Sequence, residues 1–151
     1  MSTNEDAFRA RITRQFGSDA LKGKRRYSTG VSKADVRISV DESLEIDDRL
    51  VLVEIDSGNA AKLLIGQYIL LSVFEKRARD KVLFVVVHYY DKYNADRTAK
   101  NFQFIATSVL AEQALPFVAL HESDLWTLLD GARSLEELWA KLTLRVTGTH
   151  Q

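Results

Sequence analysis

The stretch LVLVEIDSGNAAKLLIGQY, residues 50–68, passes from one hydrophobic pattern to another within a few residues. Its first seven residues are rich in β-branched side chains and apolar on both faces, which is typical of a central strand. A Ser-Gly pair with turn chemistry follows, and the apolar residues from about 60 to 78 predict a deeply packed helix. A buried strand that runs through a short turn into a helix indicates a sheet covered by helices.

The remaining segments extend this unit in both directions. Further helices are expected over residues 4–23, 94–114 and 134–146, and further strands over 24–30, 34–40, 81–90 and 116–122. The acidic stretch DESLEIDDR, residues 41–49, is expected to be a hairpin loop. The early strands are too close together for helical crossovers and should form an antiparallel meander, whereas the later strands alternate with helices and should be parallel. We therefore expect one α/β domain, a three-layer sandwich with a central mixed sheet.

Length and composition narrow the classes of function. The 151 residues suit a single domain spanning 1–151, and 46% hydrophobic residues are enough for one core. There is no cysteine, so disulfides and thiolate zinc sites are excluded, and a cytoplasmic location is expected. The chain lacks an apolar signal segment and any run near the ~18 residues of a membrane span. The sequence contains no GxGxxG, P-loop or GxSxG motif. It also has no pair of histidines at the spacing of zinc ligands.

Charge is balanced overall but unevenly distributed along the chain. Lys plus Arg and Asp plus Glu both number 21. Residues 1–40 carry nine basic and four acidic side chains, and residues 41–60 carry seven acidic and one basic. An acidic cluster beside a basic arm indicates a metal site near an anion-binding surface, although an ordinary mixed surface accounts for the same pattern.

Carboxylates at the end of the predicted central strand are the strongest functional candidates. Side chains alternate along a strand, so Glu54 and Asp56 should project from one face, roughly 6–7 Å apart. If the strand opened by Asp35 pairs with this one, three carboxylates meet at one sheet edge. Such a cluster costs several kcal/mol unless a cation offsets it, and hard oxygen ligands select Mg²⁺ or Mn²⁺. The alternative for Asp56 is a role as a turn or helix-capping residue.

The arrangement of these residues resembles the PD-(D/E)XK nuclease superfamily, which includes restriction endonucleases and Holliday-junction resolvases. Asp35 opens a strand, a second strand ends in Glu54, and a helix bearing Gln67 and Tyr68 follows. The helix–three strands–helix–strand order of that superfamily matches the expected elements over residues 4–90. The resemblance implies a restriction endonuclease-like fold and metal-dependent cleavage of DNA.

By this resemblance the candidate site residues receive roles. Asp35 and Glu54 would be metal ligands, Asp56 a third ligand or a residue acting through water, and Gln67 a positioning group. Asp56 occupies the position of the motif lysine, and Lys62, one turn into the next helix, would be a migrated lysine. A lysine at the rim of a helix with its stem on apolar surface is the other interpretation of Lys62.

Basic side chains near the N-terminus are candidates for nucleic-acid contact, because phosphate neutralisation supplies most duplex affinity. The candidates are Arg11, Arg14, Lys24, Arg25, Arg26 and Tyr27, the last as a stacking group. The expected partners are DNA and, by family analogy, a second copy of the chain or a larger complex, without a membrane. A solvated helix face explains the N-terminal arginines equally well.

Two other functions fit the same sequence. The missing motif lysine favours a catalytically inactive nuclease-fold module that binds nucleic acid or a protein partner. An unrelated α/β domain that binds a small ligand at its acidic strand end is the third hypothesis, and it predicts no metal near Asp35 and Glu54.

Overall fold

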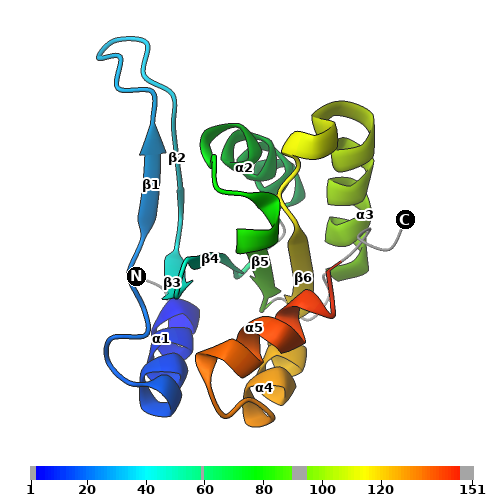
Figure 1. Cartoon of the computed structure of the whole chain (residues 1–151). Helices are drawn as coiled ribbons and strands as arrows, with labels where there is room; N and C mark the ends of the chain where they lie inside the picture. Colours follow the sequence, from blue (N-terminus) through cyan, green and yellow to red (C-terminus); the bar gives the residue numbers. More distant parts are fainter. Residues whose placement is uncertain (1–2, 59, 90–94, 147–151) are drawn as a thin grey trace.

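A four-stranded mixed sheet lies between two layers of helices, and a two-stranded ribbon stands at one side (Figure 1). The computed structural model describes residues 3–58, 60–89 and 95–146. The helices are α1 (Thr3–Phe16), α2 (Ala61–Phe74), α3 (Ala95–Ile105), α4 (Glu122–Asp130) and α5 (Leu135–Thr143). The strands are β1 (Arg25–Ser28), β2 (Arg37–Val40), β3 (Glu42–Ile46), β4 (Arg49–Asp56), β5 (Val82–His88) and β6 (Phe117–His121). Short helical turns occupy Arg79–Lys81, Ala106–Leu110 and Ala111–Gln113.

The order of strands in the main sheet is β3-β4-β5-β6. The first two strands are antiparallel and joined by a two-residue turn, while β4, β5 and β6 are parallel and joined through α2 and α3. Parallel strands need such helical crossovers, whereas antiparallel neighbours need only a turn. The expected α/β sandwich with a central mixed sheet is therefore confirmed.

Each face of the sheet has its own core, because side chains alternate along every strand. On β4, Val51, Val53 and Ile55 face the layer formed by α1, α4 and α5. Leu50 and Leu52 face the layer formed by α2 and α3, where aromatic rings pack together. In that layer the Tyr68 ring stacks on Phe102 with 4.5 Å between centroids. Helices on both faces explain why β4 reads as an almost continuous apolar run.

The acidic stretch 41–49 is not the loop that the sequence analysis expected. Residues Glu42–Ile46 form β3, and only Asp47 and Asp48 make the turn, with Asp47 at φ 58°. Leu44 and Ile46 are buried in the core beside α1, and their alternation with polar residues is the strand signal. We expected a loop because the stretch is rich in acidic residues.

Several helices end earlier than expected, since α2 ends at Phe74 rather than near residue 78 and α3 at Ile105 rather than near residue 114. Helix α1 ends at Phe16 rather than near residue 23, because Gly17 adopts φ 101° and terminates it. Helix α4 was not predicted. Ser134 caps the start of α5, because its Oγ accepts a hydrogen bond from Glu137 N at 3.1 Å. The expected starts and ends at residues 90 and 94 lie outside the described residues.

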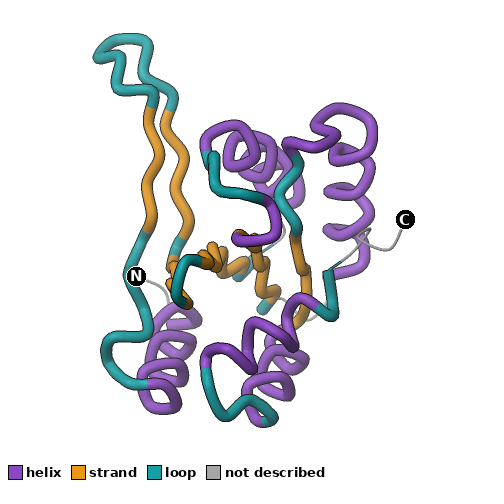
Figure 2. The backbone as a smooth tube through the Cα atoms, in the orientation of Figure 1, coloured by secondary structure: helices purple, strands orange, loops and turns teal. Residues whose placement is uncertain are grey.

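The ribbon and the main sheet share one continuous arm of chain, visible in Figure 2. Strand β2 pairs with β1 over Arg25↔Val40 to Ser28↔Arg37. Beyond Asp41 the same arm continues as β3, where Lys22 N still donates to Ser43 O at 2.8 Å. The arm thus bends at Asp41 and pairs with β4, while residues Leu21 and Lys22 stay beside it as an isolated bridge. The expected antiparallel meander of the early strands is therefore wrong in its pairing, because β1 and β2 form a separate two-stranded sheet and β3, not β2, pairs with β4.

None of the helices in the described ranges has the length and apolar character needed to cross a bilayer.

Candidate functional site

Asp41 and Glu54 face each other where the long arm bends. The ladder pairs Glu42 with Val53, so the next step along it brings Asp41 opposite Glu54. Asp41 N donates to Glu54 Oε1 at 3.2 Å, and Ile55 N donates to Asp41 Oδ2 at 2.8 Å. Backbone amides therefore hold two carboxylates together on neighbouring strands.

The Glu54 carboxyl has an unusual protonation equilibrium. Burial and, second, the negative charge of Asp41 together raise the pKa of Glu54 to about 7, although the nearby Gln67 amide opposes the rise. A carboxyl group that titrates near neutrality beside a second carboxylate is characteristic of functional sites.

A third carboxylate reaches this pair from α1. Burial raises the pKa of Glu5, and the charge of Asp41 adds to the increase. The nearest compensating cation is Arg9, whose Nη2 lies 3.9 Å from Glu5 Oε2. That guanidinium binds more closely to Glu42, with 2.7 Å between Arg9 Nε and Glu42 Oε2. Negative charge at the Asp41–Glu54 pair is thus only partly offset by Arg9.

Gln67 on α2 lies beside the pair and next to the bend. Its Nε2 donates to Ser39 O at 2.9 Å, just before the bend, and its amide lowers the pKa of the nearby Glu54. The residue is 7% exposed, and its Oε1 is buried without a hydrogen-bond partner among the described residues. An unsatisfied buried oxygen costs about 1–3 kcal/mol, so a donor or cation beside it would be favourable.

The chemistry of this group suits a hard divalent cation. Asp41, Glu54 and Gln67 offer oxygen atoms, which Mg²⁺ and Mn²⁺ prefer. Within the described ranges no three His, Cys, Asp or Glu side chains are grouped so that they could hold a metal ion. Mg²⁺ commonly uses one or two carboxylates and fills its remaining positions with water or substrate phosphate, which this pair would allow.

Asp35 does not join this group through the pairing that was expected. Its strand, β2, pairs with β1 and not with β4, and Asp35 lies in the loop at the far end of the ribbon. There its carboxylate accepts hydrogen bonds from Ser28 Oγ at 2.6 Å and Thr29 Oγ1 at 2.9 Å, and it also binds Arg37. The hydrogen bond from Ser28, followed by that from Arg37, lowers the pKa of Asp35.

Asp56 projects from the same face of β4 as Glu54, as predicted, but it serves the core. Its Oδ2 lies 2.9 Å from His88 Nδ1, and His88 Nε2 lies 2.9 Å from Thr98 Oγ1. Asp56, His88 and Thr98 are 6%, 0% and 1% exposed. This buried chain of hydrogen bonds links β4, β5 and α3, and a substrate has no access to it.

Lys62 is exposed at the start of α2. It borders a shallow depression of about 430 Å³ with Arg97 of α3. No hydrogen bond or ion pair of the described residues joins it to Asp41 or Glu54. Its role as a migrated lysine stays a prediction.

Some of the residues predicted to contact nucleic acid are held by other side chains of the protein, and the others are exposed. Arg11 binds Asp130 at 2.5 Å and lies 5.4 Å from the Trp126 ring, so it ties α1 to α4. Arg25 and Tyr27 pack against α2 through Glu75. The exposed members are Arg14, Lys24 and Arg26.

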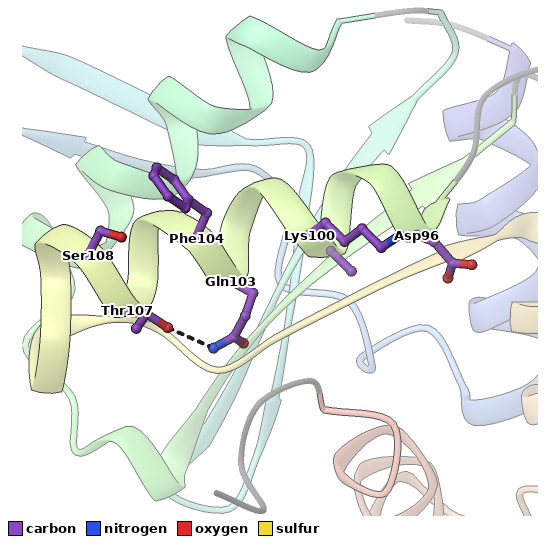
Figure 3. Close-up of a pocket in the computed structure, with 7 residues that line it drawn as sticks. Asp96, Lys100, Gln103, Phe104, Thr107 and Ser108 are labelled. Atoms are coloured by element: carbon purple, nitrogen blue, oxygen red, sulfur yellow. Dashed lines mark hydrogen bonds between the residues drawn. The ribbon is translucent and has the colours of Figure 1, made fainter.

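A hollow of about 580 Å³ lies along the outer side of α3 (Figure 3). Helix α3 and the helical turn Ala106–Leu110 that follows it supply the lining, and within it Gln103 Nε2 donates to Thr107 Oγ1 at 3.0 Å. Phe104 points away from Asp96 along this helix. The hollow lacks the convergent polar groups of a ligand site, so the carboxylate group at Asp41 is the better candidate.

Asp41 is the site residue that sequence reasoning missed. The available signal was the two-residue turn at Asp47 and Asp48, which fixes the register of β3 against β4. Counting outward from that turn places Asp41 opposite Glu54.

Comparison with protein-family models, with curated proteins and with solved structures gave no match to this chain.

Proposed function

We propose that this chain is a metal-dependent phosphodiesterase that cleaves DNA in the cytoplasm. The observation that carries the proposal is the Asp41–Glu54 pair, in which burial and a neighbouring negative charge raise the pKa of Glu54 to about 7. Such a pair is stabilised when a cation binds it. Glu54 lies on β4, the strand that precedes α2, which agrees with the resemblance to PD-(D/E)XK nucleases.

Asp41 takes the place that the sequence analysis gave to Asp35. Asp41 and Glu54 would hold Mg²⁺ or Mn²⁺, and Gln67, which donates to Ser39 O beside the pair, would be a positioning group. The bound ion supplies Lewis-acid polarisation of a phosphoryl oxygen and acidifies water. Glu5, whose pKa is raised by burial and by the charge of Asp41, would accept a proton from an attacking water.

A catalytically inactive module is the second candidate function. Asp56 stands at the position of the motif lysine, and it forms a hydrogen bond with His88 in the core. A chain with this substitution can retain binding of nucleic acid or a protein partner after losing catalysis. Assembly as a homodimer or within a larger complex stays a prediction of the resemblance.

Cleavage of labelled duplex DNA with Mg²⁺ or Mn²⁺ tests the proposal, using the wild type, Asp41→Asn and Glu54→Gln. We expect each variant to lose at least about 100-fold in rate, because each removes a charge that holds the ion. Glu45→Gln is the matched control, since Glu45 is an exposed carboxylate on the adjacent strand β3.

The outcomes separate the two candidates. Cleavage by the wild type and Glu45→Gln, but not by the other variants, supports the phosphodiesterase. DNA binding without cleavage in any metal identifies the inactive module. Cleavage that is equal in the wild type and Glu54→Gln contradicts the proposed site.

A further inference from the structure

The β1–β2 ribbon has two chemically different faces. Residues directly opposite in an antiparallel pair share a face, so Arg25 and Tyr27 lie with Ile38 and Val40. The other face carries Arg26, Ser28, Arg37 and Ser39. We call these the inner face and the outer face.

The inner face fixes the ribbon onto α2. Tyr27 Oη donates to Glu75 Oε1 at 2.7 Å, and the Tyr27 ring lies 6.1 Å from that of Phe74. Arg25 Nη2 lies 3.7 Å from the same Glu75 carboxylate. The anchor lies near the C-terminal end of α2, while Gln67 binds Ser39 O closer to the bend. These two attachments hold the ribbon in a fixed position relative to the Asp41–Glu54 pair.

The outer face is cationic and open. Together with Lys24, its residues border a hollow of about 550 Å³, whose lining also includes Tyr27 and Ile38. Lys24 and Arg26 are exposed, and neither forms a salt bridge with a residue in the described ranges. Asp35 also borders the hollow, but its charge is paired with Arg37. Lys24 and Arg26 therefore present uncompensated positive charge along one side of the ribbon.

The outer face leads toward the carboxylate pair. Arg26 is opposite Ser39, and Ser39 precedes Asp41 by two residues. Two residues of a strand span roughly 7 Å, which is close to the separation of successive phosphates along one nucleic-acid strand. A phosphate beside Arg26 would therefore place a neighbouring phosphodiester near Asp41 and Glu54.

We propose that the outer face of the ribbon binds the phosphate backbone of duplex DNA and directs one strand to the Asp41–Glu54 pair. This inference rests on the proposed function and names its substrate as double-stranded. Single-stranded binding surfaces present aromatic rings for base stacking. The one aromatic ring of the described ribbon, Tyr27, is packed on the inner face against α2, so backbone contacts to a duplex fit the outer face better.

The experiment measures DNA affinity without catalysis. Fluorescence anisotropy in EDTA follows binding of a labelled 20-base-pair duplex, and of the matching single strand, to the full chain. We compare the wild type with Lys24→Ala/Arg26→Ala. The control double variant, Lys100→Ala/Arg145→Ala, removes the same charge from exposed residues on α3 and after α5. Figure 1 shows α3 on the opposite side of the molecule from the ribbon.

We expect the ribbon variant to lose about 10- to 100-fold in duplex affinity, and the slope of log affinity against log salt to fall by roughly 2. The control should lose less than about 3-fold. Equal losses in both variants, an unchanged salt slope, no duplex binding by the wild type, or tighter binding of the single strand would each overturn the inference. Ribbon-dependent duplex binding without cleavage in Mg²⁺ or Mn²⁺ would keep the inference and reject the proposed catalysis.

Discussion

Asp41 and Glu54 lie opposite each other, and each carboxylate accepts a hydrogen bond from a backbone amide on the other's segment of chain. Asp41 N donates to Glu54 Oε1 at 3.2 Å, and Ile55 N donates to Asp41 Oδ2 at 2.8 Å. The exchange fixes both carboxylates at the bend between β2 and β3, although their charges repel. A fold that maintains this repulsion loses stability when both groups are ionised.

The first prediction concerns the pH dependence of stability. In the unfolded chain the pKa of Glu54 is near 4.5, and in the folded chain it is about 7. Between these values the folded state binds more protons, so the free energy of unfolding falls as pH rises, by about 2–3 kcal/mol in total. Urea unfolding at pH 4.5, 6 and 8 in EDTA should show this decrease.

Glu54→Gln provides the comparison for that prediction, because the amide cannot ionise. Its free energy of unfolding should change less than that of the wild type between pH 4.5 and 8, and the variant should be the more stable protein at pH 8. Identical pH profiles for the two proteins would mean that Glu54 does not titrate near neutrality.

The second prediction couples metal binding to proton release. At pH 6.5 Glu54 is mostly protonated, since its pKa is about 7, and a cation must displace that proton. Calorimetric titration of Mg²⁺ or Mn²⁺ in buffers of different ionisation enthalpy should show release of most of a proton at pH 6.5 and almost none at pH 8.5.

The proton count distinguishes this site from a surface site. Glu54→Gln should abolish the proton release together with the binding. If the heat of binding at pH 6.5 is the same in every buffer, no proton is released. The ion would then bind at other carboxylates.

The sheet was predictable because its signals are local. Val51 and Val53 face one helix layer and Leu50 and Leu52 face the other, so this segment is apolar on both faces. Helices separate the parallel strands at regular intervals. The site was less predictable because it depends on register across a hairpin. Glu54 was found as an acid inside an apolar strand, whereas Asp41 becomes its neighbour only through the two-residue turn.

The error over Asp35 has the same origin. Alternation in residues 36–40 correctly indicates a strand, but alternation does not say which strand it pairs with. Strand β2 pairs with β1, and the bend at Asp41 transfers the arm to β4. Likewise, the partner of Asp56 is His88, 32 residues away and directly opposite on a parallel strand. Nothing in the local pattern around either residue contains that information.

The third prediction assigns Asp56 to stability rather than to the metal. His88→Ala would leave the buried Asp56 carboxylate without its partner and create a cavity between β5 and α3, so we expect a loss of about 3–5 kcal/mol in urea unfolding. Thr98→Val removes only the hydrogen bond at Nε2 and should cost about 1–2 kcal/mol.

Metal titration supplies the decisive comparison for Asp56. Asp56→Asn should unfold more readily but bind Mg²⁺ or Mn²⁺ as the wild type does, as long as circular dichroism shows it folded. A folded Asp56→Asn that fails to bind the ion would restore Asp56 to the ligand set predicted from the sequence.

The fourth prediction concerns the ion pair beneath the site. The Glu42 side chain is 3% exposed and lies 2.7 Å from Arg9 Nε. Arg9→Met leaves that carboxylate buried without its cation, so the free energy of unfolding should fall by about 3–5 kcal/mol. Adding Glu42→Gln should recover part of the loss, because a neutral amide oxygen can still accept the hydrogen bond from Gly23 N. Arg14→Met, an exposed change on the same helix, should alter stability by less than about 0.5 kcal/mol. Equal effects of the two arginine substitutions in urea unfolding would show that the Arg9–Glu42 pair contributes nothing specific.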